Sequence, residues 1–152
     1  MGRADNGQRV IEADPARVWA ALTDPQALAE WLPPAGMTGT FAHFDLRVGG
    51  GYRMVLRYDD PNTTAAKSGD GSDVVDVRFV EIVPGERIVQ AVDFVADDPA
   101  FAGTMRLTWS IEPVAGGTRV EIRAEDVPSG ISAEDHAAGL ASSLANLAEW
   151  LG

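Results

Sequence analysis

Alternating apolar and polar positions run through most of the chain and predict a series of β-strands. The clearest alternation lies between residues 104 and 112, where every second residue is apolar: Met105, Leu107, Trp109 and Ile111. A period of two places these side chains on one face of a strand and their polar neighbours on the other. Further strand-like runs occupy residues 8–13, 40–46, 52–58, 74–83, 87–95 and 118–125. The alternation slips near Val80, which predicts a β-bulge there.

Helical patterns occupy both ends of the chain. Two short helices are predicted to begin at Asp14-Pro15 and Asp24-Pro25, because aspartate is a favourable cap and proline is tolerated at the first helical position. Pro33-Pro34 ends the second of them. A longer helix begins near Ser132, and it presents one stripe of leucines spaced by four, three and four residues: Leu140, Leu144, Leu147 and Leu151.

The order of these elements predicts an α+β fold in a single domain over residues 1–152. A strand comes first, then two short helices, several antiparallel strands and one long amphipathic helix. The economical packing is a curved antiparallel sheet wrapped around the C-terminal helix, since each element then buries its one apolar face. Such a sheet and helix leave volume between them, so we expect a ligand pocket there.

The amino-acid composition excludes some classes of binding partner and some kinds of catalytic chemistry. The chain has 12 basic and 23 acidic residues, a net charge of −11, and no cysteine. This charge argues against nucleic acid or an anionic membrane as the main partner, because both require neutralising lysine and arginine. The lack of cysteine removes thiol nucleophiles and cysteine-ligated metals. Neither a signal peptide nor a membrane-spanning segment is expected, so we predict a cytoplasmic protein.

The two histidines, His43 and His136, do not form a metal-binding pattern with other residues. We therefore expect no metal, no cofactor and no recognisable catalytic group. His43 is expected at the surface. His136 lies beside the leucine stripe of the last helix, where it would contact a ligand or act as a general base. The alternative is that it is a partly exposed residue at the helix start.

The residues expected to line the pocket are mostly large apolar side chains on inward positions. Gln90 differs from them, because it alternates with Ile88 and Val92 and so points inward, where its amide needs a partner. The alternative for each residue is ordinary core packing. The predicted ligand-binding set is Trp31, Tyr52, Met54, Gln90, Phe94, Met105, Trp109, His136 and Leu140.

Several segments together resemble a known superfamily. These are ADPARVWAALTDP at 13–25, Leu28 with WLPP at 31–34, FDLRVGGGYRM at 44–54, EIVPGERIV at 81–89 and EDVP at 125–128, with residues 134–140 and 144–147 in the last helix. They resemble the START-like, Bet v 1-like (SRPBCC) superfamily, in the branch related to the C-terminal domain of the activator of Hsp90 ATPase. The resemblance covers residues 8–151 and implies a helix-grip fold. Members include carriers of lipids and hydrophobic ligands, polyketide cyclases and co-chaperone domains, so the fold alone assigns no activity.

Three functions follow as expectations. The first is non-catalytic binding of a small apolar molecule between the sheet and the C-terminal helix; a cavity filled by side chains would argue against it. The second is a cyclase or hydrolase in the same cavity, with His136, Tyr52 or Gln90 polarising a carbonyl. The third is a protein-interaction module, with an Hsp90-type chaperone as partner by family analogy only. The sequence leaves the oligomeric state open, a homodimer included.

Overall fold

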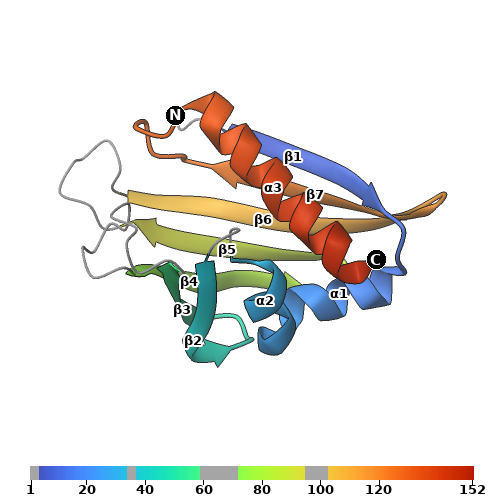
Figure 1. Ribbon diagram of the computed structural model, residues 1–152, viewed down its shortest axis with the longest axis horizontal. Coiled ribbons are helices and arrows are strands. Elements are labelled where there is room, and N and C mark those ends of the chain that lie inside the picture. The colour runs from blue at the N-terminus through green and yellow to red at the C-terminus, as the bar shows by residue number, and fades with distance from the viewer. Residues whose placement is uncertain (1–3, 34–36, 59–71, 95–102) are drawn as a thin grey trace.

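A computed structural model describes residues 4–33, 37–58, 72–94 and 103–152 of the chain. The strands are β1 (Ala4–Ile11), β2 (Met37–Asp45), β3 (Gly51–Tyr58), β4 (Ser72–Val83), β5 (Arg87–Phe94), β6 (Gly103–Val114) and β7 (Gly117–Glu125). The helices are α1 (Pro15–Thr23), α2 (Pro25–Trp31) and α3 (Ala133–Leu151). This order confirms the predicted strand, helix pair, strand series and final helix (Figure 1).

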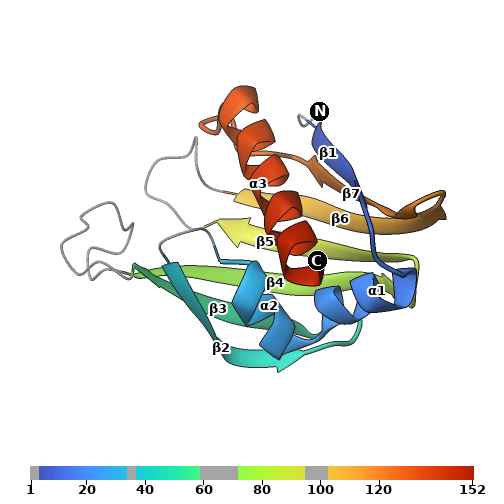
Figure 2. The ribbon, with the colours of Figure 1, turned by 45° about the vertical axis from the view of Figure 1, so that its right-hand side comes forward.

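The strands form one antiparallel sheet with the order β1-β7-β6-β5-β4-β3-β2. All three helices lie on the same side of this sheet, with α3 running diagonally across it (Figures 1 and 2). The register shifts between Phe79 and Glu81, which confirms the bulge expected near Val80. The α+β helix-grip fold is therefore the observed one.

The first strand begins earlier than its sequence pattern indicates. Residues 8–13 were the expected strand, whereas β1 begins at Ala4 and ends at Ile11. Its whole length pairs with β7, from Ala4 opposite Glu125 to Ile11 opposite Thr118. The extra residues are polar or small, so backbone pairing with a neighbour holds them in the sheet without an apolar alternation.

The long helix follows its sequence signals. The Ser132 side chain accepts a hydrogen bond from the Asp135 N–H at 3.0 Å, as the predicted cap requires. All four leucines of the stripe are buried: Leu140, Leu144, Leu147 and Leu151. Two close approaches fix the helix, one in its first half and one at its C-terminal end. A Cβ placed on Gly7 of β1 would lie 3.3 Å from the Leu140 Cβ, and the Arg17 guanidinium of α1 donates to the Leu151 carbonyl at 3.0 Å.

The short helices begin as predicted, although only one aspartate caps with its side chain. Asp24 accepts from the Gln26 N–H at 3.0 Å, while Asp14 makes no side-chain cap bond. Proline follows each aspartate and presets the helical φ angle. The paired helices are thereby placed over the face of the sheet that carries the apolar side chains.

The opposite face of the sheet carries cross-strand ion pairs. Asp76 on β4 and Asp93 on β5 are cross-strand neighbours, and each carboxylate forms an ion pair with an arginine. The Arg53 Nε donates to Asp76 at 2.7 Å, and the Arg78 guanidinium donates to Asp93 at 3.1 Å. The Thr104 hydroxyl also donates to Asp93, at 2.7 Å. The hydrogen bonds from Arg78 and then Thr104 hold the pKa of Asp93 below its ordinary value.

No helix among the described residues is long and apolar enough to cross a membrane.

Candidate functional site

A small, partly open cavity lies between the sheet and the two short helices. Its volume is about 50 Å³. Its walls come from α1, α2 and the residue after α2 on one side and from β3, β5 and β6 on the other: Leu22, Leu28, Trp31, Leu32, Tyr52, Ile88, Gln90, Leu107 and Trp109. Ligand pockets typically enclose about 300–1,000 Å³, and one water occupies about 30 Å³. As it stands, the cavity has room for one or two waters and for no larger molecule.

The cavity differs in place from the pocket that the sequence predicts. That pocket was expected between the sheet and the C-terminal helix, but no described lining residue belongs to α3. The reason is the packing of α3, which contacts β1 at one edge of the sheet as well as α1 and α2. Its leucines fill the space beneath it, and Leu144 and Leu147 are almost fully buried there. The unfilled volume is left under α1 and α2.

Two polar side chains stand out in the wall of the cavity. Tyr52 is 5% exposed and Gln90 is 8% exposed. Within the described parts of the chain, neither the Tyr52 hydroxyl nor the Gln90 amide has a hydrogen-bond partner. Burying such a group without a partner costs about 1–3 kcal/mol, so two of them at one cavity require an explanation.

The surroundings of these two groups are apolar. Gln90 stands between Phe79 on β4 and Leu107 on β6, which are its cross-strand neighbours. The Tyr52 ring packs at 5.2 Å from Phe41 and at 6.0 Å from Phe79, centroid to centroid. Burial raises the pKa of the Tyr52 phenol, so this hydroxyl stays protonated and keeps its donor hydrogen at neutral pH.

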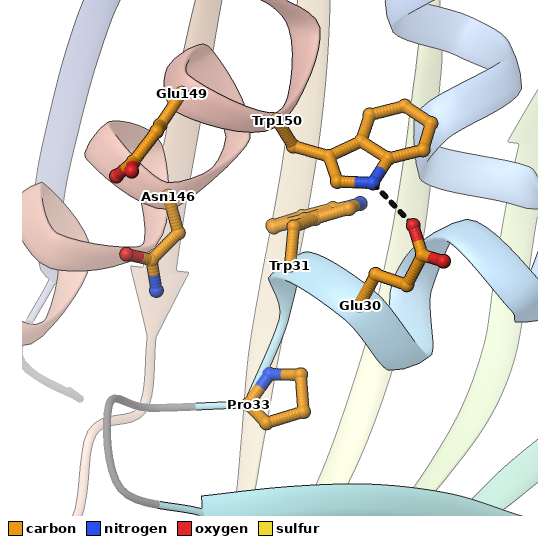
Figure 3. Close-up of a pocket in the computed structure, with 6 residues that line it drawn as sticks. All are labelled: Glu30, Trp31, Pro33, Asn146, Glu149 and Trp150. Atoms are coloured by element: carbon orange, nitrogen blue, oxygen red, sulfur yellow. Dashed lines mark hydrogen bonds between the residues drawn. The ribbon is translucent and has the colours of Figure 1, made fainter.

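Trp31 separates this cavity from an open groove on the surface. The groove has a volume of about 400 Å³ and lies between α2 and the end of α3. Figure 3 shows its lining residues: Glu30, Trp31, Pro33, Asn146, Glu149 and Trp150. Because Trp31 also lines the inner cavity, its indole is a wall that the two spaces share.

Hydrogen bonds hold both tryptophans of this region. The Trp31 Nε1 donates to the Ala21 carbonyl at 2.9 Å, and the Trp31 ring meets Trp109 edge to face at 5.6 Å. The Trp150 Nε1 donates to a Glu30 carboxylate oxygen at 2.6 Å, which joins α3 to α2 across the groove (Figure 3). This groove was not predictable from the periodicity of the sequence. Its one signal is Trp150, a large aromatic residue 40% exposed on the flank of the leucine stripe.

The structure brings together part of the predicted ligand-binding set. Trp31, Tyr52, Gln90 and Trp109 all line the cavity. Three further members are buried in the core but are not among its lining residues: Met54, Met105 and Leu140. Phe94 ends β5, and its side chain lies outside the described residues.

His136 lies at a different place in the fold. Its Nδ1 is 2.8 Å from the Asp5 Oδ2, with the two side chains 13% and 12% exposed. This contact joins the first turns of α3 to β1, and His136 is absent from the lining of the cavity. His43 is exposed, as expected. Among the residues that the structure describes, no group of His, Cys, Asp or Glu is arranged to hold a metal ion.

Comparison with known proteins identifies the family. The sequence model of the family named Activator of Hsp90 ATPase homolog 1-like protein matches residues 12–152. The chain belongs to this family. The resemblance found in the sequence is thereby confirmed over nearly the whole chain.

Solved structures agree with this Hsp90-activator-like family. Protein CV1439 from Chromobacterium violaceum is 34% identical, with 97% of this chain and 96% of that chain covered and a TM-score of 0.81. The AHSA1-like protein from Aeromonas hydrophila is 19% identical, with coverages of 97% and 91% and a TM-score of 0.77. Protein MLL2253 from Mesorhizobium loti is 21% identical, with coverages of 98% and 96% and a TM-score of 0.76. The last two, at these identities, support the fold alone. A search of curated proteins found no match.

Proposed function

We propose that the protein binds a small, largely apolar molecule in the cavity beneath α1 and α2 and does not transform it. One observation carries the proposal. An apolar cavity contains two buried polar side chains, Tyr52 and Gln90, that lack protein partners among the described residues. A well-packed core would replace such groups with apolar ones, so their presence favours a role in contacting a guest molecule.

Binding requires the cavity to enlarge. Trp31 is the shared wall between the cavity of about 50 Å³ and the groove of about 400 Å³. Turning its indole aside would join the two spaces, and the joined volume falls within the range of ordinary ligand pockets. The proposed ligand therefore enters from the groove and displaces Trp31.

We propose binding without catalysis because the cavity wall lacks side chains that commonly act as acids, bases or nucleophiles. Among the described residues that line the cavity itself, none is a histidine, carboxylate, lysine or serine, and Tyr52 is the only titratable one; the carboxylates of Glu30 and Glu149 line the groove on the other side of Trp31. A phenol whose pKa is raised by burial is a poor general base at neutral pH. His136, the base considered from the sequence, pairs with Asp5 away from this cavity. An interaction with an Hsp90-type chaperone, which is suggested by the family name alone, stays a prediction.

A displaceable fluorescent probe tests the proposal. N-phenyl-1-naphthylamine is uncharged and apolar, and its emission rises in an apolar environment. We expect saturable binding to the wild-type protein. Leu107→Phe should abolish it, because the added ring occupies the cavity that Leu107 lines. Leu56→Phe is the matched control, since Leu56 is partly buried against the core and is not a cavity-lining residue.

Two results would overturn the proposal. The first is a folded wild-type protein that binds no probe and yields no small molecule when it is extracted with organic solvent and the extract is examined by mass spectrometry. The second is equal probe binding by wild type and Leu107→Phe, which would place the bound probe elsewhere. Selective loss in Leu107→Phe, with Leu56→Phe unchanged, supports the cavity as the site.

A further inference from the structure

The chemistry of the cavity wall restricts the charge of its ligand. The described lining residues contain no charged side chain, and the Tyr52 phenol is neutral. A carboxylate or phosphate placed here would lose its hydration without gaining a counter-charge, which is far more costly than burying a neutral polar group. An anionic ligand such as a fatty acid therefore does not suit the inner end of this site.

The hydrogen-bonding capacity of the wall indicates which neutral group suits it. The Tyr52 hydroxyl has one donor hydrogen and an oxygen that also accepts, and the Gln90 amide has two donor hydrogens and one acceptor oxygen. Both point to the cavity from strands β3 and β5, on the same face of the sheet, with β4 between them. A carbonyl oxygen has two lone pairs, so one such atom can accept a hydrogen bond from each of these two residues.

The groove that leads to the cavity also disfavours an anionic ligand. The groove beyond Trp31 is lined by two carboxylates, Glu30 and Glu149, and no basic residue is among its described lining. The whole chain has a net charge of −11. An anion would therefore be repelled while it approaches, whereas an uncharged molecule would not.

We propose that the cavity selects an uncharged, mostly apolar ligand with a carbonyl oxygen at its buried end, which accepts hydrogen bonds from Tyr52 and Gln90. This inference rests on the proposed function and adds the chemical class of the ligand. Ketones, quinones, esters and amides share this chemistry. Carboxylates and phosphates of the same length are excluded by it.

Competition against the fluorescent probe tests the selectivity. The competitors are 2-decanone and decanoate, which have equal carbon number and differ in charge. At pH 7 we expect 2-decanone to displace N-phenyl-1-naphthylamine from the wild-type protein at a concentration at least tenfold lower than decanoate. Tyr52→Phe and Gln90→Met should each weaken displacement by 2-decanone about 2–10-fold, which corresponds to the loss of one hydrogen bond.

A buried polar residue outside the cavity provides the control. Thr118 is fully buried and its hydroxyl donates to the Ala13 carbonyl at 2.7 Å, so Thr118→Val removes a hydrogen bond without touching the site. This variant should keep the wild-type preference for the ketone as long as it is folded. Its behaviour separates loss of recognition from general weakening of the core.

The outcomes separate this inference from the proposed function. If the probe binds and decanoate displaces it as well as 2-decanone does, the neutral-ligand inference is wrong while ligand binding stands. If the ketone is preferred but Tyr52→Phe and Gln90→Met both leave its displacement unchanged, the assignment of the two donors is wrong. If neither probe nor ketone binds to the wild-type protein, the proposed function itself fails.

Discussion

Replacing Gln90 by methionine should stabilise the protein. Methionine has the same unbranched length as glutamine and lacks the amide, so the substitution removes a buried polar group with little change of shape. Gln90 is 8% exposed, and its cross-strand neighbours on this face are Phe79 and Leu107. Methionine would gain favourable contacts with both.

The size of the stabilisation depends on how far the Gln90 amide is hydrogen-bonded in the folded protein. Burying an amide with no partner costs about 1–3 kcal/mol. The cavity of about 50 Å³ is large enough for a water that satisfies part of the amide, which places the gain near the lower bound. We therefore expect Gln90→Met to raise the free energy of unfolding by about 1 kcal/mol and the melting temperature by about 2–4 °C.

Urea unfolding followed by circular dichroism measures this change. The midpoint should rise while the slope of free energy against urea stays constant, because the surface exposed on unfolding is almost unchanged. Thr118→Val is the opposite case, since it leaves the Ala13 carbonyl without its 2.7 Å hydrogen bond. It should lower the free energy of unfolding by about 1–3 kcal/mol.

A destabilised Gln90→Met variant would refute the reasoning. A loss of more than about 1 kcal/mol would mean that the amide makes strong hydrogen bonds in the folded protein. The case for a ligand-contacting group at Gln90 would then lose its basis, and the core interpretation of this residue would be preferred. A gain in stability together with a loss of ketone affinity would be the expected signature of a residue kept for binding.

Three further predictions concern other parts of the fold. Gly117→Ala should strongly destabilise the protein, because the φ of Gly117 is 146° and a Cβ there would overlap the Ile11 carbonyl oxygen. Gly139→Ala lies in an open position on α3 and should stabilise the protein by about 0.5–1 kcal/mol. Thermal unfolding of the two variants measures both effects. His136→Ala should lower the free energy of unfolding by about 1 kcal/mol and leave probe binding unchanged, since the residue joins α3 to β1 away from the cavity. Asp93→Asn should slightly destabilise the protein at pH 7. Because the pKa of Asp93 is lowered on folding, this difference from wild type should shrink as the pH falls below 3.8, its ordinary value, and it should also shrink in salt; a constant difference in urea unfolding across that pH range would contradict it.

Features set by local periodicity were predictable from the sequence. The leucines of α3 recur at helical spacing and are all buried, because a single helix can bury only one stripe. Gln90 keeps the phase of Ile88 and Val92, and that phase alone placed its amide inside. The bulge near Val80 showed itself as a break in the same alternation. In each case the signal and the structure involve the same few neighbouring residues.

Features that depend on distant segments were not predictable in the same way. The first residues of β1 join the sheet because β7 lies beside them, more than a hundred residues later in the chain. The position of the cavity depends on how α3 crosses the sheet, and the groove is lined by residues far apart in the chain, such as Glu30 and Trp150. His136 was considered as a ligand contact or a base, and its pairing with Asp5 also spans the chain. Periodicity gives the face of each element but not the angle at which two elements pack.

The small size of the cavity becomes consistent with ligand binding once the energy of moving Trp31 is considered. Opening the wall breaks the bond from the Trp31 Nε1 to the Ala21 carbonyl and the edge-to-face contact with Trp109. These two interactions contribute about 1–3 kcal/mol together. Burying one CH₂ group of a ligand returns about 0.8 kcal/mol, so about four buried CH₂ groups offset the loss of these two interactions. The ligand must in addition cover the surface of the indole, which is 2% exposed before it moves. A rigid wall of many interlocked residues would require far more. A single indole between an open groove and a small apolar cavity is therefore the arrangement in which an apolar chain of modest length can make its own site.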